Sequence, residues 1–213
     1  MTAIKKEETA SGLFVVLEGI DGSGKTTAWS HLKQHFAGDS DYIFLREPTD
    51  LPTGQRIRAC LQGEQTPPAT DAGWKELFVQ DRRANVEQNI VPGLQAGKTI
   101  IQDRYKHSTA AYQGADAADA HRILDELKEF PEPDILIYLR LSASAALKRI
   151  DARSARRDHF ESQQRLERIA ENYGSILPRD CIQVDAEASP EAIQDSLLEI
   201  LKAATEKQGY SGS

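Results

Sequence analysis

Apolar residues gather in five short runs along the chain, and each run is apolar on both faces of an extended strand. The runs are Phe14 to Leu17, Tyr42 to Leu45, Thr99 to Gln102, Ile135 to Leu141 and Cys181 to Val184. Such runs, rich in aliphatic and β-branched residues, are typical of parallel strands buried under helices. The pattern therefore predicts a five-stranded parallel sheet covered by helices on both faces.

Helical patterns fill the intervals between these runs. The expected helices are Thr26 to Phe36, Trp74 to Ile90 (before Pro92), Ala117 to Phe130 and Ser142 to Arg153, and a last helix opens at Ser189-Pro190. That last start combines a capping serine with a proline in the first turn. Strands that alternate with helices predict an α/β fold of three layers.

Size and composition narrow the class of protein. The 213 residues fit one domain, with polar ends and an ordered core of about residues 13–207. A net charge of −7 argues against a broad nucleic-acid or membrane surface. No apolar run approaches the roughly 20 residues that span a bilayer, and Cys60 and Cys181 lack metal-ligand spacing. We expect a cytoplasmic protein that binds neither nucleic acid nor membrane.

The first strand leads into a phosphate-binding pattern. Residues Gly19 to Thr26 match G-x-x-x-x-G-K-[ST] between a predicted strand and a predicted helix, which is the P-loop context. Backbone N–H groups, the helix N-terminus and the Lys25 ammonium attract phosphates, and the Thr26 hydroxyl suits Mg²⁺. The residues expected to bind ATP here are Gly19, Asp21, Gly22, Ser23, Gly24, Lys25, Thr26 and Thr27. The alternative, a glycine-rich turn that binds nothing, is disfavoured by this context.

A P-loop serves switch GTPases, motor ATPases and kinases alike. The chain contains no N-K-x-D motif to read guanine, and it is short for a motor. A small phosphotransferase is therefore the favoured class.

Candidate acceptor residues follow the second and third strands. Asp103 ends a predicted strand and can orient Mg²⁺ or hold Arg104, whose planar fork suits an anionic acceptor. A surface Asp-Arg pair is the alternative. Phe78 and Arg82 lie four residues apart on one helical face and together suit a flat heterocycle, although a core Phe beside a solvated Arg is as compatible with the spacing.

Several segments, in this order and spacing, resemble the successive motifs of the thymidylate kinase family. They are Glu18 to Thr27, Arg46-Glu47-Pro48, Pro52 to Arg58, Leu77 to Arg83, Asp103 to Gly114 and Pro133 to Leu139. The resemblance runs from about Phe14 through the last helix. It implies a P-loop kinase fold, Mg-ATP as donor, dTMP as acceptor and a homodimer.

The resemblance also implies roles for individual residues. Phe78 would stack on thymine and Arg82 would bond its carbonyl, while Arg58 and Arg104 would approach the monophosphate. Asp21 would serve the acceptor sugar or the Mg²⁺ shell. The other residues expected at the acceptor are Glu47, Pro48, Ser108, Thr109, Tyr112 and Gln113, with Thr109 and Gln113 at the base edge and Tyr112 against the 2′ position of the sugar.

The chain departs from the family's pattern at three places. Thr49-Asp50-Leu51 stands where Gly-Gly-Thr is common, Ala115-Asp116-Ala117 follows Gln113-Gly114, and Arg140 replaces a common acidic residue. These changes border the expected acceptor pocket, so the resemblance constrains the acceptor base less than the reaction.

Four arginines between Lys148 and Phe160 would share one face of a continuous helix, namely Arg149, Arg153, Arg156 and Arg157. A solvated helix is the usual interpretation of such a run, but the resemblance implies a lid of about residues 148–160. Lid arginines would neutralise the transferred phosphoryl group, with Arg153 ranked before Arg149 and Arg157.

The predicted catalytic residues are therefore Lys25, Asp21, Arg104 and Arg153, and the predicted Mg²⁺ ligands are Thr26, Asp21 and Asp103. Trp29 and Trp74 are interpreted as packing residues. A kinase for another deoxynucleotide or deoxynucleoside, and a P-loop nucleotide sensor without transferase activity, remain the alternative functions.

Overall fold

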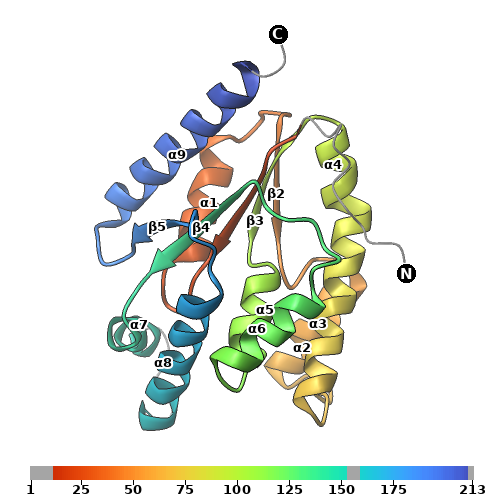
Figure 1. The fold of residues 1–213 in the computed structure, drawn as a ribbon, viewed down its shortest axis with the longest axis vertical. Helices are drawn as coiled ribbons and strands as arrows, with labels where there is room; N and C mark the ends of the chain where they lie inside the picture. Colours follow the sequence, from red (N-terminus) through yellow and green to blue (C-terminus); the bar gives the residue numbers. More distant parts are fainter. Residues whose placement is uncertain (1–11, 153–158, 211–213) are drawn as a thin grey trace.

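The computed structural model describes residues 12–152 and 159–210, and its centre is a parallel sheet (Figure 1). The strands are β1 (Phe14–Glu18), β2 (Tyr42–Arg46), β3 (Thr99–Asp103), β4 (Ile135–Arg140) and β5 (Ile182–Asp185). They lie in the order β2-β3-β1-β4-β5, and each neighbouring pair is parallel. The predicted sheet is confirmed, with every run placed to within one residue at each end.

Helices surround the sheet (Figure 1). They are α1 (Lys25–His35), α2 (Pro52–Gln62), α3 (Asp71–Asn85), the π-helical turn η1 (Val86–Ile90), α4 (Val91–Gln95), α5 (Lys106–Gln113), α6 (Ala117–Glu126), α7 (Ala143–Asp151), α8 (His159–Ile176) and α9 (Pro190–Tyr210). In the described part of the chain, no helix is both long enough and apolar enough to cross a membrane.

The register of the strands shows that helices cover both faces. Trp29 of α1 packs edge-on against Phe44, which pairs with Ile101. On α4, a Cβ added to Gly93 would lie 2.9 Å from Ile43, which pairs with Ile100. Successive strand residues point to opposite faces, so α1 and α4 lie on opposite sides of the sheet. The predicted α/β architecture of three layers is confirmed.

The carboxyl ends of three neighbouring strands, β2, β3 and β1, lie at the same edge of the sheet. Leu17 of β1 and Arg46 of β2 both pair with Asp103 of β3. The loops that follow these strands therefore leave the sheet side by side, at the edge where open α/β sheets bind ligands.

The helix predictions were less accurate than the strand predictions. Helices α2, α5 and α8 were not predicted. The helix expected over Trp74 to Ile90 begins earlier, at Asp71, where the Thr70 hydroxyl accepts a hydrogen bond from the Gly73 N–H at 3.1 Å. It also does not stop before Pro92, because η1 leads into α4 and a proline in the first turn of a helix has no hydrogen bond to lose.

Candidate active site

The loop between β1 and α1 has a backbone that only glycine tolerates at three positions. Gly19, Gly22 and Gly24 have φ angles of 151°, 84° and 90°. A Cβ at Gly22 would lie 2.7 Å from the carbonyl oxygen of Ala146, and one at Gly19 would lie 2.7 Å from Ser23 Oγ. The loop is therefore a tight turn that ends at the N-terminus of α1, where free N–H groups attract anions.

Lys25 is buried beneath this loop. Its Nζ donates to the carbonyl oxygen of Ile20 at 2.8 Å and to Ser23 Oγ at 3.3 Å. Burial and the charge of Arg104 together lower the pKa of Lys25 to about 7, against the opposing charges of Asp103, Asp21 and Glu18. Burial thus disfavours the ammonium, and a phosphate anion would stabilise its charged form.

Thr26 and Asp103 form a hydrogen-bonded pair that could coordinate a metal ion. Thr26 Oγ1 donates to Asp103 Oδ2 at 3.1 Å, while the buried Asp103 Oδ1 has no hydrogen-bond partner among the described residues. A hydroxyl and a carboxylate are ligands that Mg²⁺ accepts. No group of three or more His, Cys, Asp or Glu residues in the described ranges could hold a metal by itself. The pair therefore fits a cation that takes its remaining ligands from phosphate and water.

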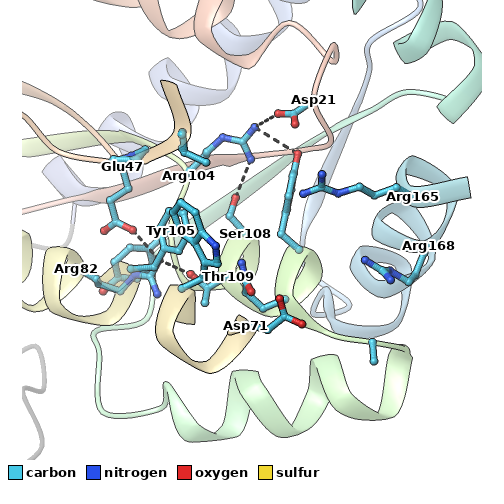
Figure 2. Close-up of a pocket in the computed structure, with 17 residues that line it drawn as sticks. Asp21, Glu47, Asp71, Arg82, Arg104, Tyr105, Ser108, Thr109, Arg165 and Arg168 are labelled. Atoms are coloured by element: carbon cyan, nitrogen blue, oxygen red, sulfur yellow. Dashed lines mark hydrogen bonds and ion pairs between the residues drawn. The ribbon is translucent and has the colours of Figure 1, made fainter. Parts of the chain in front are cut away.

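Arg104 connects the end of β3 to the P-loop. Its φ angle is 67°, a left-handed conformation that costs a non-glycine residue about 1–2 kcal/mol. Its backbone N–H donates to the Leu17 carbonyl at 3.0 Å, and Nη2 donates to Asp21 Oδ1 at 2.5 Å. Nη1 donates to Ser108 Oγ at 3.3 Å. The strained backbone directs the guanidinium toward the P-loop (Figure 2).

Glu18 anchors the helix that follows Arg104. Its carboxylate accepts hydrogen bonds from the Tyr105 N–H at 2.9 Å, from the Ser108 N–H at 3.0 Å and from the hydroxyls of Ser108 and Tyr173 at 2.5 and 2.8 Å. Burial raises the pKa of the Glu18 carboxyl, although the two hydroxyls oppose this shift. One side chain of β1 thus fixes α5 and α8 together. Its role could not be predicted from the sequence, because its partners lie up to 155 residues away.

A cavity of about 720 Å³ extends from the P-loop toward α3 (Figure 2). This volume falls within the range of small-molecule sites. All the residues predicted to bind the acceptor line it except Arg58. Arg58 instead donates to the Pro48 carbonyl at 2.6 Å and to Asp50 at 2.9 Å. Its predicted contact with the monophosphate would require release from these partners and stays a prediction.

Arg82 lies at the end of the cavity away from the P-loop and is 1% exposed. Its Nη2 donates to Glu47 at 2.6 Å and to Thr109 Oγ1 at 3.0 Å, whereas Nε and Nη1 have no partner among the described residues. The alternative of a solvated arginine is therefore wrong. Burial raises the pKa of Glu47 to about 7 against the charge of Arg82. Nε and Nη1 of Arg82 are both buried, so the carbonyl of a bound base would reach them only after a shift of the side chain.

The turn that carries Glu47 and Pro48 is held by a buried carboxylate. Asp81 of α3 accepts from the Thr49 N–H at 2.8 Å and from the hydroxyls of Thr49 and Thr53 at 2.5 and 2.8 Å. The Glu47–Pro48 peptide bond is cis. Thr49, a departure from the family's glycine, thus makes a hydrogen bond that glycine cannot make.

Trp74 and Phe78 form an aromatic wall on α3. Both line the cavity, with ring centroids 6.2 Å apart and ring planes 29° from parallel. Trp74, interpreted as a packing residue, stacks on Phe78 and also lines the cavity, whereas Trp29 is buried and donates to the Ile101 carbonyl. The four-residue spacing to Phe78 was the signal that placed Trp74 on the same helical face.

The predicted lid falls largely outside the described residues. Arg153, Arg156 and Arg157 lie there, so their roles stay predictions. Helix α7 ends at Asp151, and Arg149 near its end donates from Nη2 to the Ala186 carbonyl at 2.8 Å. In this arrangement Arg149 contacts the loop after β5.

Helix α8 contributes two arginines that the sequence analysis did not identify. Arg165 and Arg168 line the cavity on the side opposite α3. Figure 2 shows both side chains extending from α8 toward the cavity. Their three-residue spacing, which places them on one helical face, was the available signal.

Comparison with known proteins shows the family. The profile of the family described as thymidylate kinase matches residues 17–197. The thymidylate kinase of Leptospira borgpetersenii is 38% identical over 194 residues, covering 88% of this chain and 92% of the relative. That of Leptospira interrogans is 40% identical, covering 88% and 93%, and that of Xanthomonas euvesicatoria is 35% identical, covering 91% and 84%. This chain belongs to the thymidylate kinase family.

Proposed function

We propose that this protein transfers the γ-phosphoryl group of ATP to dTMP, giving ADP and dTDP. The observation that carries the proposal is the contact between Asp21 of the P-loop and Arg104 of the acceptor cavity, at 2.5 Å. This contact supports direct transfer, because it joins the P-loop, proposed to bind the donor, to the cavity proposed to bind the acceptor. The family's relatives, which are named thymidylate kinases, support dTMP as the acceptor.

The transfer needs positioning more than acid-base chemistry. A phosphate oxygen of dTMP is already anionic near neutral pH, since the second phosphate pKa is about 6. It bonds to the γ-phosphorus while the bond from that phosphorus to the β–γ bridging oxygen breaks, and ADP leaves with the electron pair. Lys25 stabilises the charge on the transferred group, and Arg104 orients the acceptor oxygen.

Base recognition occurs at the end of the cavity away from the P-loop. The base stacks on the aromatic wall of Phe78 and Trp74, and Arg82 donates to its carbonyl. The apolar side of the cavity distinguishes a methyl group by about 1–3 kcal/mol, so dTMP is preferred over dUMP by a modest factor. Tyr112 lies within 3.4 Å of Arg104 Nη2 and restricts the sugar near the phosphate end.

Mg²⁺ would be held by Thr26 and Asp103, because these side chains offer a hydroxyl and a carboxylate oxygen that has no partner among the described residues. When bound, the ion neutralises phosphate charge on the donor. The same reasoning favours ATP supplied as its magnesium complex. Asp21 is the less direct candidate, since Arg104 already engages it.

Two further features stay predictions. The homodimer implied by the family would be seen as twice the chain mass by light scattering. The cytoplasmic location rests on the sequence alone.

The decisive experiment is ADP release from Mg-ATP with dTMP, dUMP, dCMP, dGMP, UMP and thymidine as acceptors. We expect the highest kcat/KM with dTMP and a lower value with dUMP. A response to thymidine alone would indicate a nucleoside kinase. If none of the acceptors increased ADP release, the result would indicate a nucleotide sensor and would contradict the proposal.

A further inference from the structure

Arg165 and Arg168 are arginines at the cavity that have no ion-pair partner among the described residues. Both side chains are exposed and extend from α8 toward the cavity (Figure 2). The other two arginines of the cavity are engaged, Arg82 with Glu47 at 2.6 Å and Arg104 with Asp21 at 2.5 Å. The uncompensated positive charge on the described walls therefore comes from α8.

The acceptor proposed above makes a demand that the Arg104–Asp21 pair does not meet. A nucleoside monophosphate carries a charge between about −1.5 and −2 at neutral pH. When its phosphate engages Arg104, the carboxylate of Asp21 loses its partner and lies close to further negative charge. A second cation at this end of the cavity is required to balance both anions.

Arg165 is placed to act there. Burial would raise the pKa of Asp21, but the charges of Arg104 and Lys25, and at longer range that of Arg165, hold this pKa below its usual range. The positive charge of Arg165 thus already acts on the Asp21 carboxylate, which the phosphate would displace from Arg104.

Helix α8 is fixed firmly enough to hold such a residue in position. Asn172 donates to the carbonyls of Ala111 and Gly114 at 2.9 and 3.0 Å. Tyr173 donates to Glu18 at 2.8 Å. These buried bonds tie α8 to α5 and to β1, about two turns along the helix from Arg165, so its distance from the P-loop is set by the core.

We propose that Arg165 binds the phosphate of the acceptor nucleotide, with Arg168 one turn farther along α8 as an outer and weaker cation. The inference rests on the proposed function, because it requires a monophosphate acceptor. It adds a cationic group from α8 to the expected contacts of Arg104.

The test removes the arginine and the phosphate separately. Calorimetry would measure dissociation constants of dTMP and thymidine for the wild type and for Arg165→Gln, Arg168→Gln and Arg165→Lys. A hydrogen bond to a charged group changes affinity about tenfold or more. We expect Arg165→Gln to reduce the preference for dTMP over thymidine about tenfold with thymidine affinity unchanged. Arg168→Gln should have a smaller effect, and Arg165→Lys should retain part of the preference.

Arg179→Gln is the matched control, since Arg179 is an exposed arginine just beyond the end of α8 and does not line the cavity. Its preference for dTMP should equal that of the wild type. An unchanged preference in Arg165→Gln, or an equal loss for both ligands, would overturn the role of Arg165. If the wild type itself does not prefer dTMP, the proposed function fails as well, so the two failures are distinguishable.

Discussion

The P-loop and the cavity offer anions different kinds of binding group. Between Gly19 and Thr27 the anion-binding groups are mainly backbone N–H groups and a single ammonium, supplied by one continuous segment. In the cavity they are guanidinium groups from α3, from the end of β3 and from α8. Arg82 and Arg104 are held there by partners that are distant in the sequence.

This difference decides how each region responds to substitution. The P-loop has its shape from glycine backbone angles, so changing a functional side chain there leaves the fold largely intact. The cavity has its shape from buried polar pairs such as Arg82–Glu47. Removing one partner of such a pair affects folding and binding together.

The largest effect on activity is expected for Lys25→Ala. The variant removes the ammonium that stabilises the transferred group, so kcat should fall by about 10²- to 10³-fold or more. The melting temperature should change little, because the loop keeps its glycines. ADP release and thermal unfolding measure the two quantities. Lys33→Ala, at an exposed position on the same helix, is the control. Wild-type kinetics in Lys25→Ala would contradict a role of the Lys25 ammonium in the transfer.

Arg82→Met tests the other side of the comparison. The buried Glu47 loses its ion-pair partner, which should reduce the free energy of unfolding by about 3–5 kcal/mol. The loss should be greater at pH 8 than at pH 6, because the pKa of Glu47 is already about 7 and a protonated carboxyl tolerates burial. Thermal unfolding of the variant and the wild type at pH 6 and pH 8 measures this loss of stability.

Two further variants separate stability from recognition. Arg83→Met removes the neighbouring arginine, whose pair with Glu129 is partly exposed, and should cost less than about 1 kcal/mol. Glu47→Gln combined with Arg82→Met should recover much of the stability while the KM for dTMP stays high. Equal stability of Arg82→Met and the wild type at pH 8 would show that the pair does not organise the cavity.

The same contrast explains how much of the molecule could be predicted from the sequence. The sheet and the P-loop depend on local patterns, namely apolar runs and eight consecutive positions. Helix α5 was missed because its buried residues include Lys106, His107, Ser108 and Thr109, so it shows no amphipathic periodicity. Its position depends on Glu18, far away in the sequence.

The cavity shows the limits of spacing as a guide. Phe78 and Arg82 were predicted as a pair, but the burial of Arg82 depends on Glu47, 35 residues away. By residue type alone, nothing distinguishes Trp74 from an ordinary packing residue, or Arg165 and Arg168 from solvated arginines. Only the approach of α3 and α8 to the same cavity gives them a common role.

A third prediction concerns the dependence of ATP binding on pH. The pKa of Lys25 is lowered to about 7 in the free protein, and bound phosphates should restore its charge. Binding above pH 7 must then take up a proton, and affinity should fall by up to tenfold per pH unit. Calorimetry at pH 8 in buffers of different ionisation enthalpy should show an uptake approaching one proton. Lys25→Arg stays charged and should show none, and the same absence in the wild type would contradict the assigned pKa shift.

The smallest effect is expected at the aromatic wall. An aromatic pair contributes about 0.5–1.5 kcal/mol beyond its buried area, so Trp74→Ala should raise the KM for dTMP roughly 2- to 10-fold with little change in kcat. The chain has two tryptophans, and in a Trp29→Phe variant Trp74 alone reports on the cavity. Its fluorescence should change on titration with dTMP and saturate at the dissociation constant found by calorimetry. A constant signal would mean that Trp74 borders the cavity without contacting the nucleotide, and would restrict stacking to Phe78.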